Sequence, residues 1–198
     1  MRPVVLASAS PTRARLLAAA GVPVDIVPSA VNETAIKELG RSSSRPVESV
    51  ALALAEAKAL AVAANRPDAL VIGADQMLDL DGRWLDKPTD LEAAAAQLRQ
   101  LSGRPHRLIA AVAVAEGGRI AWTHGEAVRL VMRPLGRAVI DRYLAAEGAD
   151  VLSSVGAYRL EGLGAQLFEA VEGDFFAVLG LPLLPLLGYL RRAGVLPA

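Results

Sequence analysis

The sequence predicts an α/β fold in which helices cover a β-sheet. Short apolar runs alternate along the chain with Ala-rich segments of helical periodicity, a pattern typical of this fold class. The chain has 198 residues, of which 53% are hydrophobic, so it can bury a substantial core. Because no low-complexity linker divides it, we expect a single domain over residues 1–198, with or without two lobes.

The composition excludes several classes of function. Lysine and arginine together number 21, as do aspartate and glutamate, so the formal net charge at pH 7 is zero. We therefore expect no nucleic-acid partner and no polybasic membrane patch. The absence of cysteine excludes a disulfide framework and a thiol nucleophile, and two histidines make a zinc centre a poor fit. A site of carboxylates and hydroxyls suits Mg²⁺ or Mn²⁺ better.

The sequence contains no recognisable targeting or membrane segment. Its opening, MRPVVLAS, has one arginine and a short apolar run that is typical of a strand rather than of a signal peptide. The most apolar segment, at 178–190, contains two prolines and two glycines and is too short to cross a bilayer of roughly 30 Å. We expect a soluble, cytoplasmic protein with no membrane partner.

A strand followed by a capped helix is predicted at the start of the chain. Val4–Ala7 is the apolar strand, Ser10 supplies the N-cap hydroxyl, and Pro11 fits the first helical position. The helix should stop at Gly21, and its apolar stripe consists of Leu16, Leu17 and Ala20. Residues 46–64 predict a second helix, whose apolar face carries Val47, Val50, Ala51, Leu54 and Ala57.

The best candidate for a buried strand is ALVIGAD, which is expected to end at Asp75. A hairpin that turns at Asp81–Gly82 follows. Thr89 and Glu92 then fit a capping box for a helix that ends before Gly103. The leucines that this helix is expected to turn inward are Leu91, Leu98 and Leu101.

The second half of the chain predicts more strands and helices. An antiparallel meander with a turn at Gly117–Gly118 is expected from the apolar segments at 108–115, 120–122 and 128–131. Further helices are predicted at 138–146 and at about 182–192. A glycine-rich segment at 156–164 lies between them.

The first candidate site is the start of the first helix. Arg13 falls near the third helical position, where the helix dipole already makes the potential positive. A cation there makes sense if a phosphate docks among Ser8, Ser10, the backbone amides and Arg13. A capped helix with a solvated arginine explains the same residues, so both interpretations stay open.

Asp75 is the second candidate. It follows Gly73 and Ala74, small residues that would let a ligand approach the carboxyl end of the strand, where α/β sheets place their ligands. A carboxylate there can hold a divalent cation or accept a proton from water. An aspartate that simply forms a turn is the alternative.

Lysine usage gives a weaker indication. The 21 basic residues include only three lysines, at Lys37, Lys58 and Lys87. A lysine kept at 58 or 87 offers a compact ammonium for phosphate oxygens, although a solvated lysine is the ordinary alternative.

Several other motifs favour structural roles. The DLDG segment at 79–82 predicts a hairpin turn rather than a phosphotransfer aspartate, and we interpret His106 and His124 as structural or surface residues. The glycine-rich segment after Glu161 is either one wall of a pocket or a flexible turn. The P-loop pattern of ordinary nucleotidases is absent.

These signals occur together and in order, and the set resembles the Maf family of nucleotide pyrophosphatases. LASASPTRARLLAAAG at 6–21 is similar to the family's opening LASxSPRRxxLL motif, and VNE at 31–33 resembles its Asp-Glu loop. The remaining blocks of the resemblance are AEAKA at 55–59, VIGAD at 71–75, DKP at 86–88, LSGRPH at 101–106 and the segment from 156 that begins GAYRLEGLG. The resemblance covers nearly the full chain.

The resemblance implies hydrolysis of a nucleoside triphosphate to its monophosphate and pyrophosphate, with Mg²⁺ or Mn²⁺ as cofactor. It also implies a two-lobed fold like that of Maf proteins and inosine triphosphatases, with a central mixed β-sheet flanked by helices and a substrate cleft. Asp75 matches the family's proton acceptor, and Glu33 and Asp75 suit the metal. The phosphate-handling positions match Ser8, Arg13, Lys58 and Lys87. Whether Asp75 is base or metal ligand stays open.

Three positions of the resemblance concern recognition of the substrate's nucleobase, namely Thr12, Gln76 and Glu161. The pyrimidine-preferring branch has Arg, Thr and Gln there, whereas the branch that prefers 7-methyl-GTP has Trp, Gln and Glu. A carboxylate at 161 can accept hydrogen bonds from N1–H and the exocyclic amine of guanine. Thr12 fits neither branch, and Asn32 stands where the family usually has Asp. The set favours 7-methyl-GTP and a house-cleaning role.

Alternative functions stay open beside this one. The chain could hydrolyse dTTP or UTP, or act as a nucleotide-binding regulator of septum formation, the effect for which the family is named. A Rossmann-type cofactor binder is a poorer fit, because the first strand is followed by SASPTR rather than GxGxxG. The sequence does not fix the oligomeric state, and a homodimer stays open.

Overall fold

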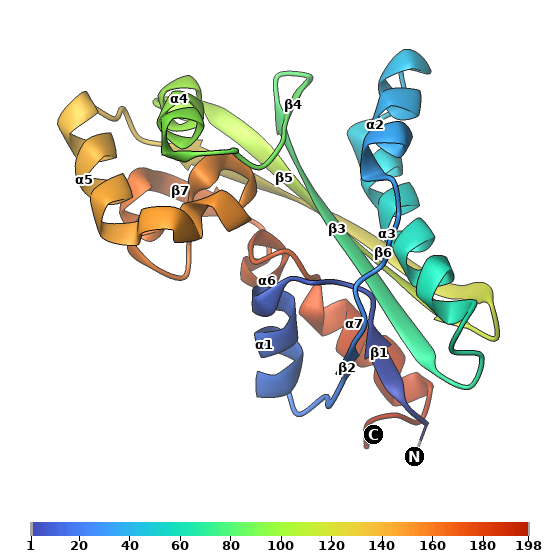
Figure 1. Cartoon of the computed structure of the whole chain (residues 1–198). Coiled ribbons are helices and arrows are strands. Elements are labelled where there is room, and N and C mark those ends of the chain that lie inside the picture. The colour runs from blue at the N-terminus through green and yellow to red at the C-terminus, as the bar shows by residue number, and fades with distance from the viewer. Residues whose placement is uncertain (1, 198) are drawn as a thin grey trace. The chain divides into compact units, whose positions relative to one another are not determined.

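The structure, a computed structural model, describes residues 2–197 and contains a mixed sheet flanked by helices (Figure 1). The sheet runs in the order β2-β1-β3-β5-β6-β7, and β4 pairs with β3. Its strands are β1 (Val4–Leu6), β2 (Asp25–Ile26), β3 (Leu70–Leu80), β4 (Arg83–Leu85), β5 (Pro105–Glu116), β6 (Arg119–Met132) and β7 (Phe168–Glu172). The pairs β1–β2 and β1–β3 are parallel, whereas β3–β4 and β6–β7 are antiparallel. The predicted α/β fold class is therefore confirmed.

The chain divides into two compact units. Within the described residues, unit 1 runs to Gln76 and also includes Ala110–Glu126 and the segment from Gly180 onward. Unit 2 consists of Met77–Ile109 and Ala127–Leu179.

Unit 1 contains four of the helices, α1 (Pro11–Ala19), α2 (Glu33–Ser42), α3 (Val47–Ala63) and α7 (Leu183–Arg192). Figure 1 shows α3 on one side of β3 and both α1 and α7 on the other. The buried face of α3 follows the predicted periodicity, but Ala55 and Lys58 are buried on it whereas Ala57 is only half-buried.

Unit 2 contains α4 (Leu91–Leu101), α5 (Arg137–Glu147), α6 (Phe175–Val178) and three short 3₁₀ helices, η1 (Gly148–Ser153), η2 (Val155–Ala157) and η3 (Leu163–Leu167). Its core includes a polar aromatic cluster. His106 Nε2 lies 2.9 Å from the hydroxyl of Tyr158, whose ring meets Phe168 edge to face at 4.8 Å between centroids. Burial raises the pKa of Tyr158 well above its usual value.

The local turn and cap predictions are largely confirmed. Ser10 is the N-cap of α1, with its hydroxyl accepting from the N–H of Arg13, and Pro11 occupies the first helical position. Asp81 and Gly82 form the β3–β4 turn with positive φ at both, as a two-residue hairpin requires. The carboxylate of Asp79 accepts from the N–H of Gly82, so DLDG is a turn.

Two predictions around β3 and α4 are wrong. The strand does not end at Asp75 but continues to Leu80, because its second half pairs with β4. The N-cap of α4 is Asp90 rather than Thr89, since Asp90 Oδ1 accepts from the N–H of Ala93 at 2.7 Å. Leu98 and Leu101 are fully buried as expected, whereas Leu91, at the first position of α4, is exposed.

Other elements differ from the sequence prediction. The segments at 120–122 and 128–131 belong to one continuous strand, β6. The helix α2 was not predicted, although Asn32 caps it by accepting from the N–H of Ala35. Among residues 2–197, every helix is too short or too polar to cross a bilayer.

Candidate active site

Lys58 joins two carboxylates inside unit 1. Its Nζ lies 2.6 Å from Oδ1 of Asp75 on β3 and 2.7 Å from Oε1 of Glu33 at the start of α2. The side chains of Lys58 and Asp75 are 9% and 7% exposed, whereas that of Glu33 is 45% exposed. The structure thus brings together three residues that the sequence predicted for the site.

The position of Lys58 depends on close packing of α3 against β3. Gly73 faces α3, and a Cβ there would lie 2.1 Å from the carbonyl oxygen of Ala55 and 2.6 Å from the amide nitrogen of Ala59. Asp75 lies two residues further along the strand and so shares the face of Gly73. The expectation that Gly73 leaves room for a ligand is therefore wrong, because the helix backbone occupies that room.

Asp75 has one carboxylate oxygen without a partner. Oδ1 accepts from Lys58, but Oδ2 is buried and has no hydrogen-bond partner among the described residues. A buried polar atom in this state costs about 1–3 kcal/mol, more for a charged group, unless a ligand or water satisfies it. Oδ2 is therefore an acceptor available for a water molecule or a cation.

Arg13 is buried on α1 and donates mostly to backbone carbonyls. Its Nε donates to the carbonyl of Gly180 at 2.8 Å, and Nη1 donates to Ala74 O at 2.9 Å and to Ser8 Oγ at 3.1 Å. Burial lowers the pKa of Arg13, while Asp75 and Glu33 act to raise it. Only its Nη2 lacks a hydrogen-bond partner among the described residues, so the capacity of Arg13 for a phosphate is smaller than the sequence indicated.

Ser8 is arranged as a hydrogen-bond donor. Its buried Oγ accepts from the N–H of Ser10 at 3.2 Å and from Arg13. Since these bonds use the oxygen's lone pairs, the hydroxyl proton is free to donate to an anion. The backbone of α1 offers a phosphate fewer N–H donors than expected. Pro11 has no N–H, and the N–H groups of Arg13 and Ala14 already donate to Ser10.

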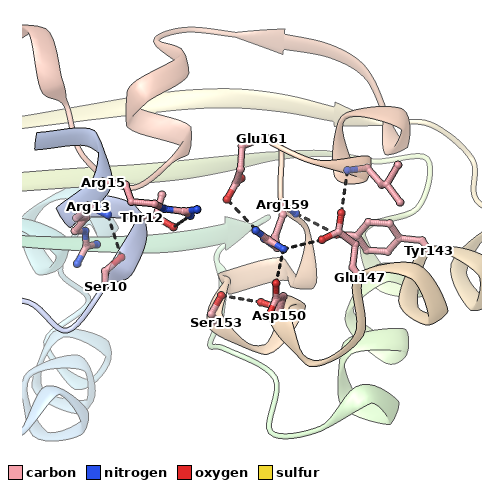
Figure 2. A network of polar contacts seen from close by, with 11 residues as sticks. Ser10, Thr12, Arg13, Arg15, Tyr143, Glu147, Asp150, Ser153, Arg159 and Glu161 are labelled. Carbon is pink, nitrogen blue, oxygen red and sulfur yellow. Dashed lines mark hydrogen bonds and ion pairs between the residues drawn. The ribbon is translucent and has the colours of Figure 1, made fainter. Parts of the chain in front are cut away.

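The remaining unit 1 candidates lie near these groups in the chain. Thr12 is half-buried, and its Oγ1 accepts from Arg15 Nη2 at 3.3 Å (Figure 2). Gln76 follows Asp75 on β3, and a Cβ at Gly180 would lie 3.6 Å from its Oε1 and 3.5 Å from Nε of Arg13. Gly180 has φ of 93°, a conformation that favours glycine, whereas these neighbours would lie at ordinary contact distance from a Cβ.

Glu161 and Lys87 belong to unit 2. Lys87 is exposed and follows β4. Figure 2 shows the Arg159 guanidinium surrounded by three carboxylates, with Glu161 on one side and Glu147 and Asp150 on the other. Sequence reasoning did not identify Arg159, because its carboxylate partners do not form a recognisable motif.

Two carboxylates of unit 1, those of Glu33 and Asp75, lie around Lys58 and are candidates to hold a divalent cation. Among residues 2–197 no group of three or more acidic or histidine side chains is placed to hold a metal. Mg²⁺, however, commonly takes one or two protein carboxylates and completes its shell with substrate phosphates and water. Glu33 and Asp75, with the unpartnered Oδ2, fit that donor set.

The polar residues buried in the structure support a single centre in unit 1. Tyrosine aside, the buried polar or charged residues among those described are Ser8, Arg13, Lys58, Asp75, Asp79 and His106. The first four are predicted site residues, all in unit 1. Burial of polar side chains is costly, so a concentration of this kind indicates function.

Several curated proteins are similar to this chain over almost its whole length. A nucleoside triphosphate pyrophosphatase of Hyphomonas neptunium is 52% identical over 98% of both chains, and one of Paramagnetospirillum magneticum is 50% identical over 97% of this chain and 99% of that protein. A 7-methyl-GTP pyrophosphatase of Rhizobium meliloti is 47% identical over the full length of both. A solved nucleoside-triphosphatase (dITP/XTP pyrophosphatase) of Mycobacterium abscessus, with 98% of both chains covered, is more distant, at 17% identity and a TM-score of 0.46.

The family comparison covers almost the whole chain. The model of the Maf-like proteins matches residues 3–193. This range includes every candidate site residue. The chain belongs to the Maf-like protein family.

Proposed function

We propose that this chain is a nucleoside triphosphate pyrophosphatase that hydrolyses 7-methyl-GTP to 7-methyl-GMP and pyrophosphate. The activity is supported by family membership and by curated relatives at about half identity. The observation that carries the proposal is Asp75, whose Oδ1 is fixed by Lys58 while the buried Oδ2 has no partner. A fixed carboxylate with one open acceptor suits the orientation of an attacking water.

In the proposed reaction, a water hydrogen-bonded to Oδ2 of Asp75 attacks the α-phosphorus. A new P–O bond forms to the water oxygen, the bond from the α-phosphorus to the bridging oxygen breaks, and pyrophosphate leaves. The water proton passes to Oδ2. Lys58 holds the carboxylate in place through Oδ1, which lowers the orientational freedom of the base.

The charge that develops on the pyrophosphate requires donors and cations. We assign Ser8, through its free hydroxyl proton, and the ammonium groups of Lys58 and Lys87 to this role, with Nη2 of Arg13 as a further donor. The two roles of Asp75 are alternatives, because Oδ2 cannot take a proton and hold a cation at once; in the metal role, Glu33 and Asp75 would hold a divalent cation. Such a cation, when bound, neutralises negative charge on phosphate oxygens.

The proposed base preference rests on Glu161 and Gln76. A carboxylate at 161 accepts hydrogen bonds from guanine N1–H and its amine, and its charge favours the cationic methylated ring. Relatives named 7-methyl-GTP pyrophosphatase, at 46–47% identity, support this choice. Glu161 and Gln76 are the residues that the 7-methyl-GTP branch carries at these positions.

The test is a screen of the purified protein with Mg²⁺ or Mn²⁺ against 7-methyl-GTP, GTP, dTTP, UTP and CTP. We expect the highest kcat/KM with 7-methyl-GTP and a monophosphate with pyrophosphate as products. Diphosphate with phosphate would disprove the mechanism. A preference for dTTP or UTP would reject the substrate, and inertness toward every triphosphate would favour a regulatory role in septum formation.

Asp75→Asn tests the assigned base directly. We expect kcat to fall by about 10³-fold while the affinity for nucleotide changes little, because loss of a general base typically removes 10²–10⁴-fold. Asp79→Asn is the matched control, since Asp79 is also buried on β3 but holds the hairpin turn and Arg107. The control should lose stability and keep kcat. Equal kcat in Asp75→Asn and wild type would remove Asp75 from the reaction.

A further inference from the structure

We propose that Arg159 is a positioning residue for base recognition, which holds the Glu161 carboxylate in place and is itself anchored by Glu147. This inference rests on the proposed function, because it assigns Glu161 to the base. Figure 2 shows the arrangement, in which the guanidinium of Arg159 lies between Glu161 and the carboxylates of Glu147 and Asp150.

The ion pair between Arg159 and Glu161 orients the Glu161 carboxylate but leaves its two oxygens free of hydrogen bonds from described side chains. Nε of Arg159 lies 3.6 Å from Oε1 of Glu161, beyond hydrogen-bond distance but within an ion pair. Glu161 makes no hydrogen bond to another described side chain, and its side chain is 27% exposed. Both of its oxygens therefore remain able to accept from the two donors on the guanine edge.

Arg159 can act in this way because it is firmly held. Its Nη1 lies 2.9 Å from Oε2 of Glu147 and 2.8 Å from Oδ2 of Asp150. The Glu147 side chain is 8% exposed and that of Asp150 is 70% exposed. Because exposed ion pairs contribute little, Glu147 is the main anchor.

The same glutamate also fixes the backbone on the other side of Glu161. Oε1 of Glu147 accepts from the N–H of Leu163 at 2.9 Å, and the hydroxyl of Tyr143 accepts from the N–H of Arg159 at 3.1 Å. A Cβ at Gly162 would lie 2.8 Å from Oε1 of Glu147, so a larger residue there would have to displace this carboxylate. The segment 159–163 is thus bound to α5 at both ends.

The charge of the cluster suits an electropositive base. Burial acts against the charge of Arg159, but Glu147, Glu161 and Asp150 outweigh it and raise the pKa of Arg159. Three carboxylates face one guanidinium, so negative charge is left over. A base with two N–H donors and a positive ring would reduce that excess, which a pyrimidine with more carbonyl acceptors would not.

The test compares Arg159→Gln, Glu147→Gln, Arg159→Lys and a matched control, Arg129→Gln. Arg129 lies in the same unit and pairs with Glu172 at 2.7 Å, but both side chains are about half exposed. We expect Arg159→Gln and Glu147→Gln to raise KM for 7-methyl-GTP about tenfold while kcat stays within about threefold. Arg159→Lys should raise KM less than Arg159→Gln does, since lysine keeps the positive charge but lacks the planar guanidinium with its several N–H donors. Arg129→Gln should match wild type.

A double-mutant cycle distinguishes positioning from general damage. If Arg159 acts through Glu161, Arg159→Gln should not raise KM further in a Glu161→Gln background. Full additivity of the two effects would overturn the proposal. So would an unchanged KM in Arg159→Gln whose melting temperature equals that of wild type. If Arg159→Gln does not fold, the same cycle is run with Arg159→Lys.

Measurements on the wild-type protein distinguish a failure of this proposal from a failure of the proposed function. If wild type prefers a pyrimidine triphosphate, the assigned substrate is wrong, and the cycle is measured on the preferred nucleotide. If wild type is inert, the cycle is measured as Kd for 7-methyl-GTP by calorimetry. In each case coupling between Arg159 and Glu161 supports the positioning role, and its absence overturns it.

Discussion

Two clusters in the molecule each place carboxylates around one cation. The Lys58 cluster of unit 1 consists of Lys58, Asp75 and Glu33, and the Arg159 cluster of unit 2 consists of Arg159, Glu147, Asp150 and Glu161. They differ in whether the buried carboxylate has hydrogen-bond partners for both of its oxygens. Around Lys58, the buried Asp75 keeps an oxygen without a partner. Around Arg159, the buried Glu147 uses both oxygens, one for the guanidinium and one for the N–H of Leu163. The open oxygen of Asp75 is consistent with the proposed reacting group, and the fully bonded Glu147 is consistent with the proposed positioning role.

Lys58→Met should have the largest effect, because it leaves two carboxylates facing each other around a buried position. Removing one partner of a buried ion pair typically costs about 3–5 kcal/mol, and loss of the fixed carboxylate should lower kcat by at least about 10²-fold. Urea denaturation and steady-state kinetics measure the two effects. Arg66→Gln is the control, since it breaks an exposed ion pair of 2.7 Å with Asp25 and should change stability by less than about 1 kcal/mol. Equal losses in both variants would contradict the comparison.

Gly73→Ala should displace Lys58 from Asp75, although Gly73 is not itself a member of the Lys58 cluster. A methyl group there meets the backbone of α3, which must move away from β3 and carry Lys58 with it. We expect a loss of about 3 kcal/mol or more in the free energy of unfolding, together with reduced kcat. Gly125→Ala on β6, where a Cβ has nothing within 4 Å, should leave both unchanged. A fully active Gly73→Ala variant would show that close packing of α3 is not needed.

The pH dependence of stability should report on unit 2. Burial lowers the pKa of His106 from 6.5 to about 4, so the folded state binds this proton less readily than the unfolded chain. The stabilisation is complete above pH 6.5 and is lost as the pH falls toward 4, by at most about 3 kcal/mol. Urea titrations of wild type and His106→Gln should therefore have different slopes of stability against pH in this window. Parallel curves would exclude His106 as the source.

Thr12→Trp should give the smallest effect and tests whether unit 1 also influences base choice. An aromatic ring at this position could stack on a cationic base, worth about 0.5–1 kcal/mol at a partly exposed site, or two- to fivefold. We expect a lower KM for 7-methyl-GTP and no change for UTP, measured under identical metal conditions. A gain of equal size for both nucleotides would contradict a role in base choice.

Features of the fold that depend on neighbouring residues were predictable from sequence. The cap of α1 at Ser10 and the turn at Asp81–Gly82 are decided by local hydrogen bonds and by the conformations that each residue allows. The end of β3 was not predictable in this way, because the strand continues past Asp75 by pairing with β4. The N-cap at Asp90 was misplaced by one residue, since Thr89 and Asp90 are both good caps.

The site was predicted as a set of residues rather than as an arrangement. The family motifs identified Lys58 and Asp75, but their contact depends on how α3 packs on Gly73. Two of the three acceptors around Arg13 are backbone carbonyls, which no side-chain pattern reveals. Arg159 was missed for a related reason, because its three carboxylates are set around it by the turn from α5 into η1 and by the glycine-rich segment.

The bond from Arg13 to the carbonyl of Gly180 joins residues that are 167 positions apart. During synthesis, the first helix leaves the ribosome long before its partner has been translated. Unit 1 therefore cannot satisfy this guanidinium until the last part of the chain has emerged, and long-range closure of this kind slows folding. The arginine at the start of the chain therefore has its full set of partners only after the segment that contains Gly180 has been translated.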